Sequence, residues 1–182
     1  MIAQTPSLRS LSRFFFAANA AELQNAYDGL AAEATPPLPV VEEWKAVEFS
    51  FNRLFVGPRT LQAPPYASIY LDGDDTRLMG ASTSRVRQLY AMLGLASPWQ
   101  NQIPDDHLAL ELDALWQIEQ ALASVSSPQL EDARAYLIAR LQAWVPAFVG
   151  RIQAAPQVHP AIVAVAGALT RALSTVDHVA AC

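Results

Sequence analysis

Apolar residues recur at intervals of three and four along most of this chain, which is the spacing of one face of an α-helix. One such stripe runs from Trp44 to Leu54 and ends at Gly57-Pro58, where a helix cannot continue. Residues that commonly cap or open helices stand before most of the stripes. The expected helices begin near Thr5, Asn19, Val41, Ser82 or Thr83, Leu108, Ser127 and Pro160.

Two segments lack this periodicity. Residues 58–81 contain the sequence Pro64-Pro-Tyr66, and within them Ser68–Leu71 is expected to be briefly extended. Residues 95–104 form the second segment. The pattern therefore predicts an all-α fold, with a single helical-bundle domain over residues 1–182 and two long loops.

Composition narrows the class of protein. The chain of 182 residues carries a net charge of −5, and nucleic acid is not expected as a partner because phosphate binding needs clustered Lys and Arg. Its single cysteine, Cys182, cannot form an internal disulfide, which fits a reducing, cytoplasmic compartment. No secretory signal is seen, and the longest apolar run, Ala161 to Leu169, is too short for a bilayer.

Two acids and a histidine, Asp105-Asp106-His107, stand where the helix from Leu108 begins. Asp is a good N-cap and favours the positive end of the helix dipole, by about 0.5–2 kcal/mol, so the acids could serve the helix alone. That account leaves His107 unexplained, because a helix N-terminus disfavours a positive charge. Glu111 follows His107 by four residues and projects from the same helix face.

Catalytic and metal-binding chemistry finds little support in the sequence. Zinc needs three or four ligands, whereas His159 and His178 fall in contexts unrelated to His107 and Glu111. The loop serines lack a Gly-x-Ser-x-Gly turn, and no Gly-rich phosphate loop is present. We therefore expect no catalytic residue, no metal and no cofactor. Two alternatives stay open: a helical-bundle metal protein or enzyme centred on His107 and Glu111, and a non-catalytic oligomerisation scaffold.

Large apolar side chains gather around the two loops. Leu54 and Phe55 precede the break in the helix, and Tyr66 and Trp99 lie in the loops themselves. Aromatic residues in such positions suit the wall of a groove for an apolar peptide. We expect an open trough at Leu54, Phe55, Tyr66 and Trp99, with Asp105 or Asp106 supplying an acidic rim.

Three motifs, in this order, resemble those of the TorD/DmsD family of redox-enzyme maturation proteins. They are Phe51-Asn-Arg-Leu-Phe-Val-Gly-Pro58, then Pro64-Pro-Tyr66 with Ser68-Ile-Tyr70, then Pro104-Asp-Asp-His-Leu108. The likeness covers about residues 40–150. One position departs from the family pattern, because Ile103 stands where members commonly have Glu.

The resemblance implies a cytoplasmic chaperone for a molybdopterin oxidoreductase. Such a chaperone binds the twin-arginine signal peptide or the apo-enzyme and delays export until the cofactor is inserted. A monomer and a domain-swapped dimer both fit the long loops. The residues expected to bind the client are Phe51, Leu54, Phe55, Gly57, Pro58, Pro65, Tyr66, Ser68, Trp99, Pro104, Asp105, Asp106, His107 and Glu111.

Overall fold

The computed structural model describes residues 7–58, 60–72, 80–95 and 103–180. Within these ranges the chain forms α-helices and one π-helical segment without any strand, so the all-α prediction is confirmed. The elements are α1 (Leu8–Phe16), α2 (Ala20–Glu33), α3 (Trp44–Phe51), η1 (Asn52–Val56), α4 (Ser68–Leu71), α5 (Ala81–Met92), α6 (Leu108–Leu122), α7 (Pro128–Ala154) and α8 (Pro160–Ala180).

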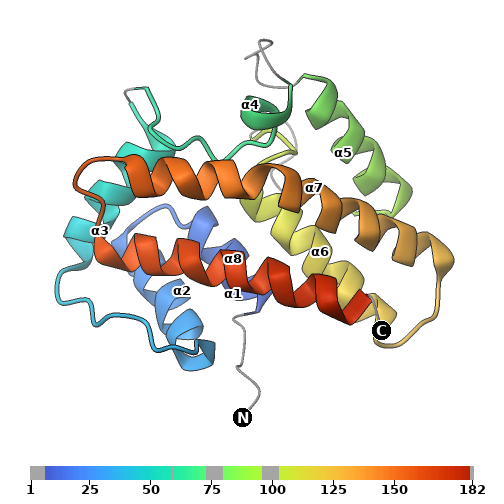
Figure 1. The fold of residues 1–182 in the computed structure, drawn as a ribbon, viewed down its shortest axis with the longest axis horizontal. Helices are drawn as coiled ribbons and strands as arrows, with labels where there is room; N and C mark the ends of the chain where they lie inside the picture. The colour runs from blue at the N-terminus through green and yellow to red at the C-terminus, as the bar shows by residue number, and fades with distance from the viewer. Residues whose placement is uncertain (1–6, 59, 73–79, 96–102, 181–182) are drawn as a thin grey trace.

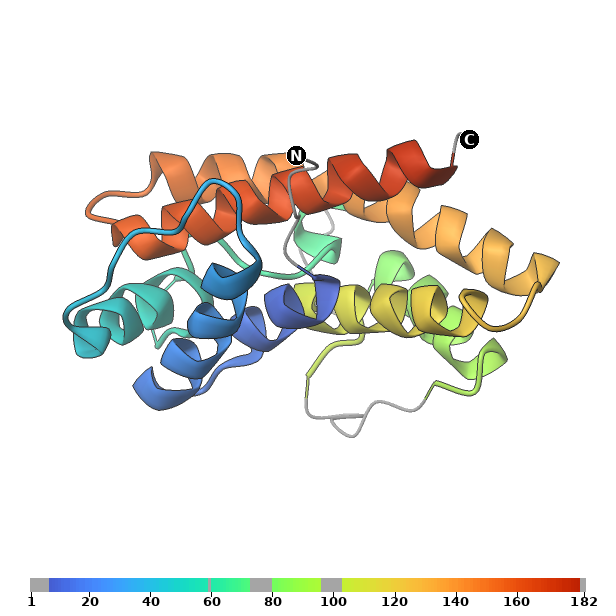
Figure 2. The same ribbon diagram turned by 90° about the horizontal axis from the view of Figure 1, so that it is seen from below.

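The long helices α7 and α8 lie side by side and antiparallel (Figure 1). Figure 2 shows them as one layer, with α1, α2, α3 and α6 in a second layer beneath. Within that second layer α1 packs on both α2 and α6, and it also contacts α8 in the first layer. The α6 helix packs on α7, and α4 lies against α7 and α5. This arrangement places the starts of α4 and α6, which carry two of the sequence motifs, next to α7.

The described elements share one hydrophobic core, and much of it is aromatic. The ring of Phe55 contacts the rings of Phe15, Phe51 and Phe148 at centroid distances of 5.8, 4.9 and 5.7 Å. Trp144 of α7 is fully buried beside Phe148. Burying a side chain of this size stabilises the fold by roughly 1.5–3 kcal/mol. The first motif thus contributes directly to the core.

Several helix starts lie where the sequence predicts them. The Asn19 side chain accepts a hydrogen bond of 3.0 Å from the backbone N–H of Glu22, and the Glu22 carboxylate accepts one from Ala18. This arrangement is close to a capping box, but the N–H that Glu22 accepts belongs to Ala18, one residue before the N-cap. Ser127 caps α7, and α8 begins at Pro160 as expected.

Two helices begin later than predicted. The N-cap of α1 is Ser7, whose hydroxyl accepts a hydrogen bond from the backbone N–H of Ser10, and the expected cap Thr5 lies outside the described residues. The α3 helix begins at Trp44 rather than Val41.

The segment Ser68–Leu71, predicted to be extended, is instead the short helix α4. The Asp72 carboxylate, just after α4, accepts hydrogen bonds from the hydroxyl and the backbone N–H of Ser82. The N-cap of α5 is Gly80, so Ser82 and Thr83, the predicted caps, both lie inside the helix. Among the described helices, none is both long enough and apolar enough to cross a membrane.

Candidate functional site

The first motif changes the helix type. At Asn52 the α3 helix passes into η1, and the backbone N–H of Gly57 donates to the Asn52 carbonyl at 2.8 Å, which closes a π-type turn. Gly57 has a φ of 106°, a conformation that favours glycine, and this agrees with its expected place at the helix end. π-helical turns are rare and are frequent at functional sites.

Two of the side chains expected to line an open trough are buried. Leu54 is 0% exposed and Phe55 is 4% exposed, and both pack into the core. The expectation that they form the wall of an open groove is therefore wrong for this conformation. Tyr66 is half-buried, and Trp99 lies outside the described residues. The binding role of these residues stays a prediction.

An antiparallel β-bridge joins the second motif to the third, with Tyr66 opposite His107. Beside this bridge, the backbone N–H of Leu108 donates to the Pro65 carbonyl at 2.8 Å. The rings of Tyr66 and His107 also meet edge to face, with centroids 5.1 Å apart. Two motifs that are distant in sequence thus form one continuous piece of structure.

Asp106 holds this junction together from inside. Its Oδ2 accepts a hydrogen bond of 2.7 Å from the backbone N–H of Ser68, and its backbone carbonyl accepts one of 3.0 Å from Ala67. Because Ser68 is the first residue of α4, the carboxylate caps a helix that lies elsewhere in the sequence. Asp106 is 0% exposed, so the prediction of an exposed rim acid is wrong for it.

Asp105 is also engaged within the protein. Its carboxylate pairs with the Nε of Arg87 on α5, and its backbone carbonyl accepts a hydrogen bond of 3.3 Å from the Tyr90 hydroxyl. The Asp105 side chain is buried, whereas the Arg87 side chain is partly exposed. Asp105 therefore attaches the loop before α6 to α5 and presents little carboxylate to a ligand.

His107, and not an aspartate, is the N-cap of α6. Its Nδ1 accepts a hydrogen bond of 3.1 Å from the backbone N–H of Ala109, so the prediction of an Asp cap is wrong. Burial lowers the pKa of His107 to about 4, although the nearby Asp106 carboxylate acts in the opposite direction. The imidazole is therefore neutral at pH 7, and a neutral ring nitrogen can accept where an imidazolium cannot. This explains a histidine at the positive end of a helix.

Glu111 is fully buried between α6 and α7. Its Oε1 accepts a hydrogen bond of 2.7 Å from Arg140 Nε, and its Oε2 accepts one of 3.1 Å from Trp144 Nε1. Burial raises the pKa of Glu111 to about 7. Two effects oppose this rise: the positive charge of Arg140, and the hydrogen bonds that Arg140 and Trp144 donate to the carboxylate. The three residues form a buried polar link between the two helix layers.

Arg140 and Trp144 are the partners that the sequence did not identify. Arg140 stands on the buried face of α7 among Leu137, Leu141 and Trp144, all at helical spacing. A cation on an otherwise apolar stripe is the signal that could have indicated a buried acid opposite. The sequence could not say which acid supplied the charge.

The side chains of His107 and Glu111 have different partners, although the backbone N–H of Glu111 donates to the His107 carbonyl at 3.1 Å. His107 bonds to Ala109 and packs against Tyr66, whereas Glu111 bonds to residues of α7. Over the described part of the chain, no group of three or more His, Cys, Asp or Glu side chains is placed to hold a metal ion.

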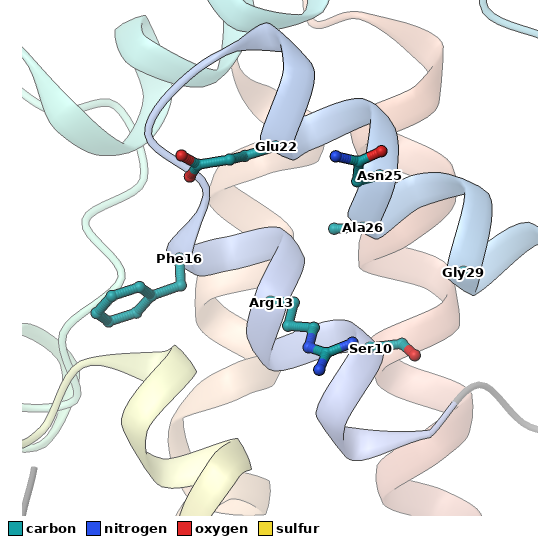
Figure 3. A pocket seen from close by; sticks show the side chains of 7 residues that line it. All are labelled: Ser10, Arg13, Phe16, Glu22, Asn25, Ala26 and Gly29. Carbon is teal, nitrogen blue, oxygen red and sulfur yellow. The ribbon is translucent and has the colours of Figure 1, made fainter. Parts of the chain in front are cut away.

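A cleft of about 390 Å³ lies between α1 and α2, next to the third motif (Figure 3). Phe16 is one of its walls, and the Phe16 ring also contacts the His107 ring at a centroid distance of 6.1 Å. In Figure 3 this ring points away from Arg13, which lies on the same helix. The cleft thus reaches the third motif through Phe16. Its lining residues are Ser10, Arg13, Phe16, Glu22, Asn25, Ala26 and Gly29.

Known proteins with similar sequences and a similar fold include several chaperones. Residues 16–150 match the model of the family described as nitrate reductase delta subunit. The Tat proofreading chaperone DmsD of Salmonella paratyphi A is 36% identical over 94 residues, 50% of this chain and 46% of that protein. The chain thus spans about half the length of this relative. The chaperone protein TorD of a Psychrobacter species is 31% identical over 175 residues, 88% of this chain and 73% of that protein.

A redox enzyme maturation protein from Archaeoglobus fulgidus has a similar fold. Its crystal structure superposes with a TM-score of 0.65 at 17% identity, over 92% of this chain and 91% of the other. The family match, which covers most of the chain, and the TorD relative agree with the three motifs described above. The chain belongs to the nitrate reductase delta subunit family, which includes the TorD and DmsD chaperones.

Proposed function

We propose that this chain is a cytoplasmic chaperone for a molybdopterin oxidoreductase. It binds the twin-arginine signal peptide of its client, or the apo-enzyme, and delays export until the cofactor is inserted. It acts by binding and not by catalysis. Membership of a family whose relatives are named as chaperones supports this proposal.

The Tyr66–His107 bridge is the observation that carries the proposal. It brings the Pro-Pro-Tyr loop against the Asp-Asp-His segment, so two of the three motifs become one surface. The Asp106 and Glu111 carboxylates accept buried hydrogen bonds from Ser68 of α4 and Arg140 of α7, and these bonds fix the surface to the two helices. A receptor for a peptide gains affinity when its binding surface is already ordered before the peptide arrives.

The predicted client-binding residues that the structure describes, all but Trp99, fall into two groups. Most are buried, and we infer that these support the shape of the surface without touching the peptide. The buried members are Phe51, Leu54, Phe55, Pro65, Ser68, Asp105, Asp106, His107 and Glu111. Gly57, Pro58, Tyr66 and Pro104 are half-buried or exposed, and these are the members that a peptide can contact directly.

Charge favours the encounter with an arginine pair. The chain carries a net charge of −5, and attraction between opposite charges raises the association rate and orients the ligand. Since Asp105, Asp106 and Glu111 are all paired inside the protein, the attraction comes from the surface as a whole. We propose a monomer or a domain-swapped dimer as the active form.

Calorimetric titration with a twin-arginine peptide tests the proposal. The comparison peptide has both arginines replaced by glutamine, and we expect it to bind about tenfold more weakly, a loss of about 1.4 kcal/mol. A Tyr66→Ala variant should bind the arginine peptide more weakly than the wild type, because Tyr66 is only half-buried and lies at the junction of two motifs.

Tyr136→Ala is the matched control, since Tyr136 is a partly exposed tyrosine on α7 outside the motifs. Thermal unfolding of both variants confirms that each is folded. Equal affinity of the wild type for the two peptides, or no binding of either, would contradict the proposed binding of the signal peptide.

A further inference from the structure

The link between α2 and α3 is rich in proline and runs along the outside of the molecule (Figure 1). From Pro36 to Glu43 its sequence is Pro-Pro-Leu-Pro-Val-Val-Glu-Glu, and we call this segment the proline strap. The strap contains none of the three motifs and no residue that lines the cleft between α1 and α2. The proposed chaperone function therefore gives it no role.

The strap is extended and its burial follows a three-residue period. The chain makes no turn or bend from Pro37 to Val41, and from Pro36 to Trp44 every two exposed positions are followed by one partly buried position. The partly buried positions are Leu38, Val41 and Trp44, and all three pack against the core. A polyproline II helix has three residues per turn and so places every third side chain on one edge. The burial pattern therefore identifies this conformation.

Local sequence and tertiary contacts both fix the strap in this conformation. Each proline holds its own φ at about −65° and disfavours helical ψ values in the residue before it. The hydroxyl of Tyr27 on α2 donates a hydrogen bond of 2.7 Å to the Pro39 carbonyl. The Tyr27 ring also contacts the Trp44 ring, with centroids 5.3 Å apart. Because the strap is ordered in the free protein, a partner that binds it loses little conformational entropy.

Two edges of the strap face solvent and carry apolar side chains. By the same period, Pro36 and Pro39 lie on one edge, and Pro37 and Val40 lie on the other. Val40 is 92% exposed, the highest value for a large hydrophobic side chain among the described residues. A segment that only linked two helices would gain nothing from this exposed apolar surface. Proline-rich chains in this conformation are instead recognised by grooves lined with aromatic residues.

Charge at the end of the strap defines the rim of such a groove. Glu42 and Glu43 follow the apolar positions, and both are exposed. Within the ranges that the structure describes, neither carboxylate forms an ion pair, and the neighbouring Lys45 pairs with Glu48 at 3.0 Å. A complementary groove therefore carries Lys or Arg beside its aromatic residues.

We propose that the proline strap is a docking site for a partner protein that has an aromatic groove with a basic rim. Trp or Tyr side chains of the partner pack against the three prolines and Val40, and its basic side chains pair with the two glutamates. This partner differs from the peptide that binds at the motif surface. The assignment is therefore independent of the proposed chaperone function.

Photocrosslinking in cells that produce the chain tests the proposal. The photoreactive residue p-benzoylphenylalanine is placed at position 40 of the full chain, and at position 125 as the control, since Val125 also lies in a loop and is 56% exposed. We expect position 40 alone to crosslink to a peptide that contains Trp or Tyr close to Lys or Arg. A free peptide of residues 34–44 should compete, and the same peptide with its three prolines replaced by alanine should not.

Titration of the purified partner with the full chain then measures what each group contributes. Pro39→Ala keeps the carbonyl that Tyr27 binds and should weaken binding by about tenfold. Glu42→Lys combined with Glu43→Lys should weaken binding most at low salt, because salt screens exposed charges. Val125→Ser is the matched control and should bind as the wild type does. Thermal unfolding shows whether each variant is folded.

Val40→Ser keeps the test decisive if Pro39→Ala lowers the melting temperature, since Val40 is almost fully exposed. It should also weaken binding by about tenfold. Three results would each overturn the proposal: no crosslink specific to position 40, a crosslinked peptide without both aromatic and basic residues, or equal affinity of the wild type and Val40→Ser. Failure of a twin-arginine peptide to bind would contradict the chaperone function and leave the docking site standing.

Discussion

The Asp106 carboxylate accepts a 2.7 Å hydrogen bond from the backbone N–H of Ser68, and both residues are buried. This bond links the Asp-Asp-His segment to the first turn of α4. It therefore explains the acid of the third motif, whereas the donor is a backbone N–H and does not require a serine. The acid caps the helix that the serine begins.

Asp106→Ala should lower the free energy of unfolding by about 1.5–3 kcal/mol, because a buried N–H loses a charged acceptor. Ser68→Ala is the matched control. It keeps the backbone N–H and removes a hydroxyl oxygen that is buried without a partner in the described structure, so its effect should be small. Urea unfolding measures both. Equal losses for the two variants would show that the serine side chain matters as much as the acid.

At pH 8, above the Glu111 pKa of about 7, Glu111→Gln should destabilise the protein by about 3–5 kcal/mol, because it leaves the buried Arg140 charge without a counter-ion. The control is Glu48→Gln, which breaks the pair with the exposed Lys45 and should cost under about 1 kcal/mol. The same unfolding assay applies. If the two variants lost similar stability, the Glu111–Arg140 pair would not be the link between α6 and α7 that its geometry indicates.

Phe55→Ala should lower stability by about 3–5 kcal/mol, because Phe55 packs on three other rings of the core. Phe49→Ala should change stability little, since Phe49 is mostly exposed. Thermal unfolding of the two variants compares a buried and an exposed phenylalanine of neighbouring helical turns. A small loss of stability in Phe55→Ala would contradict a core role for Phe55 and would favour its predicted role in peptide binding.

His107 should make the protein less stable in acid. Its pKa is about 4 in the folded protein and 6.5 as a free side chain, so the unfolded chain binds more protons between these values. The free energy of unfolding therefore falls as the pH drops through this window. His107→Asn keeps a capping oxygen but cannot titrate.

When the pH falls from 7 to 4, the free energy of unfolding of the wild type should drop by up to about 3 kcal/mol more than that of the His107→Asn variant. Glu111, whose pKa is raised to about 7, acts in the opposite direction but is present in both proteins. Its contribution cancels in the difference. Parallel stability curves for the two proteins would mean that His107 is not held neutral by the fold.

The helices were predictable because each one carries its own signal. The stripe from Trp44 to Leu54, the Asn19 cap and the Ser127-Pro128 start depend on neighbouring residues alone. α4 was missed because its first N–H is capped by Asp106, which local sequence does not reveal. The His107 cap was missed for a similar reason, since burial makes the ring neutral and so able to accept.

The candidate site was predictable in its motifs but not in its geometry. The sequence identified Asp105, Asp106 and Glu111 as notable acids, yet each has a partner on another helix. Pairing of this kind depends on how helices pack, and the acids therefore turned inward instead of forming a rim.

Hydrogen–deuterium exchange with and without a twin-arginine peptide tests the central claim most directly, because it reports both binding and location. We predict that the peptide slows exchange at backbone amides in residues 52–58, 65–68 and 103–108, where the three motifs lie. Exchange in the second half of α6, away from the motifs, should not change. A peptide that slows exchange nowhere in these segments, or only elsewhere in the chain, would contradict the account.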